Sequence, residues 1–187
     1  MVQSEVRVIC GATIILLGTA AVACSSATAP PLSNGSLVTD ASSYVARPTG
    51  PASPNYPQSY TFAVISRFTN MSADTIYLGR CFPRSTYPLF GVALADTSMA
   101  KRSGYDPAWG CVGHDQQFAI APRDTRVDTL QITGPTAVDG VTHQALGMLE
   151  GRFHLTYEVQ GCRGDDACRI DGPVSRSNEF TVRLSSQ

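Results

Sequence analysis

The sequence lacks an excess of charge of either sign. Its 187 residues carry 14 basic and 15 acidic side chains, and Lys101 is the only lysine. Proteins that bind nucleic acids need a clustered positive surface, so this composition predicts no nucleic-acid partner. Hydrophobic residues make up 43% of the chain, which is enough to build an ordinary core.

Short catalytic motifs are absent as well. The chain contains no G-x-S-x-G, H-E-x-x-H, G-x-G-x-x-G, P-loop or C-x-x-C pattern, each of which would indicate a particular chemistry. The only histidines are His114, His143 and His154, and adjacency along the chain, as in His114-Asp115, does not make a catalytic dyad. We therefore predict no catalytic residue, no cofactor and no enzymatic activity. A metal-dependent or hydrolytic enzyme is kept as a third hypothesis, after the two binding functions given at the end of this section.

One long apolar run is present, and it lies near the N-terminus. Residues 8–23 are almost wholly apolar and follow a short polar stretch that carries Arg7. A permanent membrane-spanning helix needs about 20 such residues, and this run has 16. The order of charged, apolar and small residues is that of a secretory signal peptide. No second apolar run follows, so we expect no transmembrane helix in the mature chain.

The end of this run, Ala21-Val22-Ala23-Cys24, resembles the lipobox of bacterial lipoproteins. The resemblance implies that residues 1–23 are a signal peptide, that Cys24 carries a diacylglycerol group, and that the new N-terminus is acylated too. Two or three acyl chains anchor a protein durably, whereas one holds it only marginally. Ala21 departs from the family, which usually has leucine there, and an ordinary A-x-A signal site with a chance cysteine is the alternative.

The resemblance also implies a location. Ser25 follows Cys24, at the position where enteric-type lipoproteins carry the aspartate that retains them at the inner membrane. We therefore expect an exported protein that is lipid-anchored to the cell envelope, at the outer membrane if the host has one. The expected partners are the membrane, through the anchor, and an envelope or extracellular protein.

The segment after Cys24 is rich in proline and serine. Residues 25–58 hold six of the chain's twelve prolines, and such composition is typical of linkers. We predict that residues 24–58 are a lipidated cysteine followed by a disordered tether. The alternative is that residues 37–48 form a first strand that docks on the domain.

From residue 59 the sequence predicts an all-β domain that extends to residue 187. Stretches rich in β-branched and aromatic residues are separated by turn residues, at 60–70, 75–81, 87–96, 117–121, 125–133, 151–159 and 178–185. Alternation, as in Phe153, Leu155 and Tyr157, indicates strands with one buried face. Pro122-Arg123-Asp124 predicts a hairpin turn or a corner between sheets, and at most a short helix is expected at 142–149. Seven or eight strands favour an antiparallel β-sandwich.

Residues 60–159 look like the bacterial Ig-like sandwich domains of the type found in the BsuPI proteinase inhibitor. The matching pieces are FTNMSADTIYL, the isolated Trp109, FAIAPRDT and the strand start Gly151-Arg152-Phe153. The resemblance implies an Ig-like fold far more than it implies inhibition. The antibody-type spacing of cysteine and tryptophan is absent, because Trp109 lies 28 residues after Cys81.

Four cysteines remain in the domain once Cys10 and Cys24 are set aside. An even number in an exported domain predicts two disulfides, and these residues are Cys81, Cys111, Cys162 and Cys168. Three pairings are possible. We favour Cys162–Cys168, which flank a tight polar loop, and this leaves Cys81–Cys111. A zinc site at Cys111 and His114 is the rival interpretation, but zinc sites usually show two close ligand pairs, so we expect no metal.

Two loops are candidates for binding. The cysteine-flanked loop contains Arg163-Gly164-Asp165, the tripeptide of integrin ligands, and its acidic residues lack the spacing of a calcium loop. The glycine-rich stretch 103–115 carries Tyr105 and Trp109, which would form an exposed aromatic contact, unless Trp109 fills the core. We predict a non-catalytic, lipid-anchored envelope protein whose Ig-like domain binds a protein or serves assembly. A proteinase-inhibitor-like domain, acting through 103–115 or 162–168, is the alternative.

Overall fold

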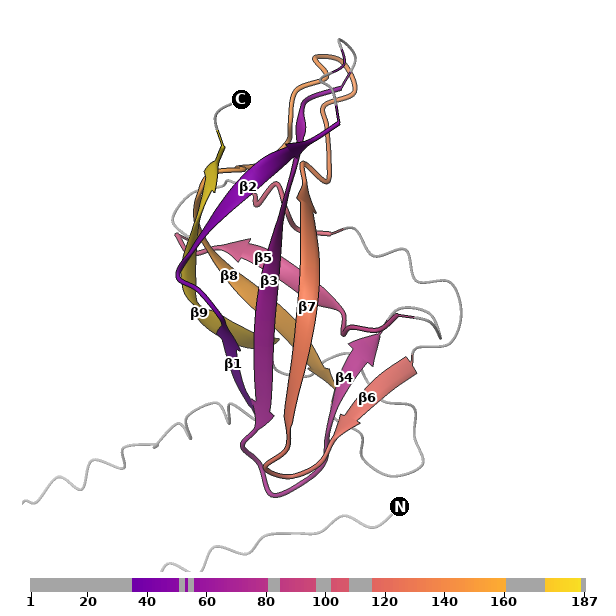
Figure 1. Ribbon diagram of the computed structural model, residues 1–187. Helices are drawn as coiled ribbons and strands as arrows, with labels where there is room; N and C mark the ends of the chain where they lie inside the picture. Colours follow the sequence, from indigo (N-terminus) through magenta and orange to yellow (C-terminus); the bar gives the residue numbers. More distant parts are fainter. Residues whose placement is uncertain are drawn as a thin grey trace, which may run out of the picture. The chain divides into compact units, whose positions relative to one another are not determined.

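The structure is a computed structural model that describes residues 35–50, 53, 56–80, 85–96, 102–107, 116–160 and 174–185. Its regular elements are all β-strands, and no helix occurs among these residues. The predicted all-β class is therefore confirmed. The strands, shown in Figure 1, are β1 (Gly35–Thr39), β2 (Ser43–Thr49), β3 (Ser59–Asn70), β4 (Ile76–Arg80), β5 (Phe90–Leu94), β6 (Gln116–Ile120), β7 (Thr125–Gly134), β8 (Gly151–Gln160) and β9 (Val174–Leu184).

The nine strands of the described residues belong to one mixed, curled sheet (Figure 1). In one half, β3 pairs with β7 over Tyr60–Thr69 and with β1 on its other side. In the other half, β8 pairs with β9, β5 and β4. Strand β2 joins the halves, because Ser43–Ala46 pairs parallel with β9 and Arg47–Thr49 pairs antiparallel with β3. The predicted antiparallel pairing therefore has one parallel exception, and the Ig-like sandwich stays a prediction.

The core lies between the two halves of the sheet and is built by alternation. On β8 the side chains of Phe153, Leu155, Tyr157 and Val159 are buried, as the sequence pattern predicts. An aromatic cluster joins the halves, since the ring of Phe62 on β3 packs against that of Phe180 on β9 with ring centroids 6.4 Å apart. Each such side chain contributes about 1.5–3 kcal/mol when it is fully buried.

Strands β1 and β2 correct the predicted boundary at residue 59. Both lie in the stretch predicted to be linker, and the compact unit runs from Leu32 to Gln187. Leu37, Tyr44 and Ala46 are buried, and they bind these strands to the core. The proline and serine content of residues 25–58 conceals this short alternating pattern, so the alternative of a docked first strand at 37–48 describes the chain better.

Two local predictions are resolved by the strand pairing. Residues 122–124 form a corner, because β6 pairs with β4 whereas β7 pairs with β3. Arg123 adopts a φ of 69° there, in the left-handed region. The short helix expected at 142–149 does not form; this stretch consists of turns and isolated bridges.

Candidate functional site: the apical loops

Two loops emerge from the same end of β3. Ser59, the first residue of β3, pairs with Thr49, and Tyr60 pairs with Gly134 at the end of β7. The β2–β3 connection and the β7–β8 connection therefore start side by side (Figure 1). We call this the apical end, and we call residues 56–58 and 135–149 the apical loops. The opposite, basal end of β3 is at Asn70, which pairs with Gly35.

The β7–β8 loop folds into a small hairpin of its own. The backbone N–H of Leu146 donates to the carbonyl of Ala137 at 2.9 Å, and that of Asp139 donates to the carbonyl of Gln144 at 2.9 Å. These bonds pair the two arms of the loop across its tip. A loop that satisfies its own backbone groups in this way holds one conformation without packing against a sheet.

The tip of this hairpin is held by one carboxylate. An Asp139 carboxylate oxygen accepts the backbone N–H of Thr142 at 2.6 Å, the N–H of Val141 at 2.9 Å and the Thr142 hydroxyl at 2.9 Å. These hydrogen bonds, led by that of the Thr142 backbone, lower the pKa of Asp139 below its ordinary value. They fix Val141 at the tip, where 88% of the residue is exposed.

The base of the loop is pinned by residues 102–105. The N–H of Thr136 donates to the Gly104 carbonyl at 2.9 Å, and the N–H of Gly104 donates to the Met148 carbonyl at 2.8 Å. Gly147 fits here because its φ is 101° and because a Cβ would lie 2.7 Å from the Gly104 nitrogen. Only glycine tolerates both conditions.

Tyr105 supports the loop from below. Its side chain is buried, only 1% exposed, and packs edge-on against the rings of Phe62 and Phe153. Its hydroxyl donates to the Leu149 carbonyl at 2.8 Å, and burial raises the pKa of Tyr105 above its ordinary range. The prediction of an exposed aromatic contact is therefore corrected for Tyr105, because the ring fills the core beneath the apical loops.

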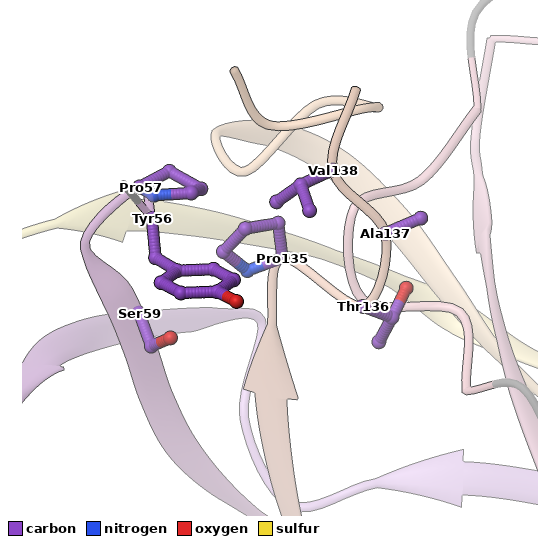
Figure 2. A pocket seen from close by; sticks show the side chains of 7 residues that line it. All are labelled: Tyr56, Pro57, Ser59, Pro135, Thr136, Ala137 and Val138. Carbon is purple, nitrogen blue, oxygen red and sulfur yellow. The ribbon is translucent and has the colours of Figure 1, made fainter. Parts of the chain in front are cut away.

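A shallow pocket of about 180 Å³ lies between the apical loops. In Figure 2 the ring of Tyr56 points toward Pro135, while Val138 overhangs from the opposite loop. The other lining residues are Pro57, Ser59, Thr136 and Ala137. Tyr56, Val141 and Leu146 are among the exposed large hydrophobic residues of the chain. The apical end therefore carries both a small depression and exposed apolar side chains.

A cluster of polar side chains lies in the core beside β7, and its members bind one another. Arg126 binds both oxygens of Asp128, with its Nε at 2.9 Å and a terminal nitrogen at 2.6 Å. The hydroxyls of Tyr157 and Ser66 lie 2.6 Å apart, and burial raises the pKa of Tyr157 well above its ordinary value. Buried groups paired in this way stabilise a fold, and we assign this cluster a structural role.

Most of the site residues named from the sequence lie outside the described residues. These are Cys24, Cys81, Cys111, Cys162, Cys168, Trp109, Arg163 and Asp165, and His114 does as well. The ring Nδ1 of His154 lies 2.9 Å from the Ser177 carbonyl oxygen, and His143 lies in the β7–β8 loop. Within the described ranges, no group of three metal-ligating side chains is close enough to hold an ion. No helix of the described residues is long and apolar enough to cross a bilayer.

Sequence reasoning missed the residues of the apical loops. One signal was available, because Asp139-Gly140 is a strong turn dipeptide. The base of the loop is held by residues 102–105, which are more than 30 residues away in sequence, and no local pattern reveals that contact.

Comparison with known proteins gives no assignment, since neither the protein-family models nor the curated proteins contain a match to this chain. The function is therefore argued from the geometry of the apical loops.

Proposed function

We propose that this chain is a non-catalytic, lipid-anchored protein of the bacterial cell envelope that binds a partner protein through its apical loops. The observation that carries the proposal is the display of Val141, 88% exposed, at a loop tip whose backbone N–H groups donate to Asp139. An apolar side chain that is already fixed loses little conformational entropy on binding, and exposed apolar residues on a loop above a rigid scaffold are typical of recognition sites.

The point at which the chain enters the domain supports a partner site at the apical loops. Ten residues, 25–34, separate Cys24 from Gly35, and they span at most about 35 Å when extended. Gly35 lies at the basal end, opposite the apical loops. A strand as long as β3 extends roughly 36 Å, so an anchor on Cys24 would keep the basal end near the membrane. The apical loops would then point away from it, toward a partner.

The same loop favours one alternative, a proteinase-inhibitor-like activity. An exposed segment held by internal hydrogen bonds suits an inhibitor, because a protease meets a conformation that needs no further ordering. Among the described residues this segment is 137–146, between the paired Ala137 and Leu146. An inhibitor would slow a serine protease in a peptide-hydrolysis assay and resist cleavage after Val141.

Crosslinking from the native envelope tests the proposed function. A photoreactive residue is placed at Val141 and, as a matched control, at Met71, which is also exposed but follows β3 at the basal end. We expect Val141 to crosslink to one envelope protein, Met71 not to do so, and the product to disappear in the Leu146→Asp variant. Equal crosslinking from both positions would refute the assignment to the apical loops.

A further inference from the structure

Among the described residues, no strand pairs with the backbone groups on the outer edge of β7. In the described residues β7 pairs with β3 alone (Figure 1). The N–H of Asp40 donates to the Ile65 carbonyl, so the backbone groups of Ile65 point toward β1 and away from its β7 partner, Thr129. Antiparallel pairs alternate between bonded and non-bonded. Asp128 and Leu130 therefore bond to β3, whereas Val127, Thr129 and Gln131 direct their backbone groups outward.

Two other edges of the sheet, those of β1 and β5, each have an N–H capped by a side chain. On β1, the outward N–H of Thr39 donates to the Asn178 side-chain oxygen at 2.8 Å. On β5, the N–H of Val92 donates to the Asp106 carboxylate at 3.1 Å. No corresponding bond reaches the outward backbone groups at 127–131 in the part of the chain that the structure describes. At ten residues, β7 is thus a long edge with an uncapped centre.

The side chains of β7 leave this edge accessible. Proteins protect edge strands with lysine, proline, bulges or inward-pointing charges. Strand β7 contains neither lysine nor proline, and its only inward charges, Arg126 and Asp128, neutralise each other. On the outer face, Val127 is 54% exposed, and it shares a row with Arg67 and Val38 across three strands.

We propose that the edge at Val127–Gln131 accepts an extended segment of a partner protein as an additional strand. The main-chain groups of Val127, Thr129 and Gln131 would supply the hydrogen bonds, as in other cases of strand addition. Beside Val127, the incoming strand would place a β-branched or apolar side chain, because neighbouring side chains on one face of a sheet pack together.

A second copy of the chain fits this edge less well than a partner segment. In a two-fold symmetric dimer the two β7 strands would run antiparallel, so the basal end of one copy would lie beside the apical end of the other. The Gly35 of that copy would then lie at the apical end of its neighbour. Ten residues would hardly connect both copies to one membrane. This step alone rests on the proposed lipid anchor, and the choice of an extended segment rests on the backbone geometry.

Hydrogen exchange of the full chain in detergent micelles tests the proposal. The probe is a synthetic nine-residue peptide of alternating threonine and valine with an added lysine at each end. We expect it to slow exchange at the amides of Val127, Thr129 and Gln131 and to leave the amide of Thr39 unchanged. Binding without this protection pattern, or no binding at millimolar peptide, would overturn the proposal.

A proline variant gives an independent readout. Thr129→Pro removes an outward N–H that makes no bond to β3, and proline is tolerated at such edge positions. We expect it to weaken peptide affinity about tenfold or more, because a main-chain hydrogen bond is lost and the ring stands in the path. The control Thr129→Ala keeps the N–H and stays within about twofold of the unmodified chain.

The other possible results of these experiments also test the strand-addition proposal. Equal affinity in Thr129→Pro and Thr129→Ala overturns the proposal, and so does a dimer of the full chain that Thr129→Pro abolishes, which would assign the edge to a second copy. If Thr129→Pro does not fold, the exchange pattern of the unmodified chain still decides. The Val141→Asp variant is expected to leave peptide affinity unchanged, so a failure of the apical-loop proposal is distinguishable from a failure at this edge.

Discussion

Arg126 is expected to be among the most sensitive positions for stability outside the aromatic core. Its guanidinium binds both carboxylate oxygens of Asp128, lies 3.6 Å from the ring centroid of Phe118 and donates to the Thr86 carbonyl at 2.7 Å. It thereby connects β7 to β6 and to the β4–β5 loop. The Asp128 side chain is only 4% exposed, whereas that of Arg126 is 23% exposed.

The Arg126→Met variant removes the charge but keeps much of the apolar stem. It leaves the Asp128 carboxylate buried, with the Tyr157 hydroxyl 3.5 Å away as its remaining side-chain neighbour. Breaking a buried ion pair by removing one partner costs about 3–5 kcal/mol, and the partial exposure of Arg126 moves the expectation to the lower end, about 3 kcal/mol. Urea unfolding followed by circular dichroism measures this loss as a lower midpoint at constant slope.

The double variant Arg126→Met, Asp128→Leu is the control. It removes both charges, and replacing a buried pair with apolar residues is often neutral or stabilising. We therefore expect the double variant to recover most of the lost stability. A loss below about 1 kcal/mol in Arg126→Met, the range of a solvent-screened pair, would refute the reasoning. So would a double variant that is less stable than the single one.

Three further predictions concern the apical loops and the termini of the mature chain. Gly147→Ala is expected to lower stability by about 1–3 kcal/mol in thermal unfolding, because it introduces both strain and a clash, whereas Gly140→Ala, with open space around its Cβ, is expected to be neutral. The pKa of Asp139 is depressed from 3.8, so the hydrogen bonds of the tip contribute fully above that value and are lost as the pH falls through the lower folded pKa; the protection of the Val141 amide, relative to its intrinsic exchange rate at each pH, should fall as Asp139 is protonated, and protection that stays constant through that titration would contradict the assignment. Intact mass of the protein from its native membrane should begin at Cys24 with acyl chains added, and the later cysteines should resist alkylation until reduction; an unlipidated species with free thiols would contradict both expectations.

The sequence alone predicts the strands after residue 59 closely. The stretch predicted at 125–133 is observed as Thr125–Gly134, and that at 151–159 as Gly151–Gln160. These predictions succeed because alternation is a local property with a period of two residues. The strands within 35–49 are harder to predict, because they are short, they lie in a proline- and serine-rich stretch, and their buried positions Leu37, Tyr44 and Ala46 are few.

The sequence by itself determined the all-β class and the buried face of β8. Only the tertiary structure decided that Tyr105 fills the core, that β2 joins the two halves of the sheet, and that β7 pairs with β3 alone among the described strands. The physical reason is distance along the chain. Ser43 pairs with Thr181, and the ring of Tyr105 packs against Phe62 and Phe153, so no local pattern in the sequence contains either contact.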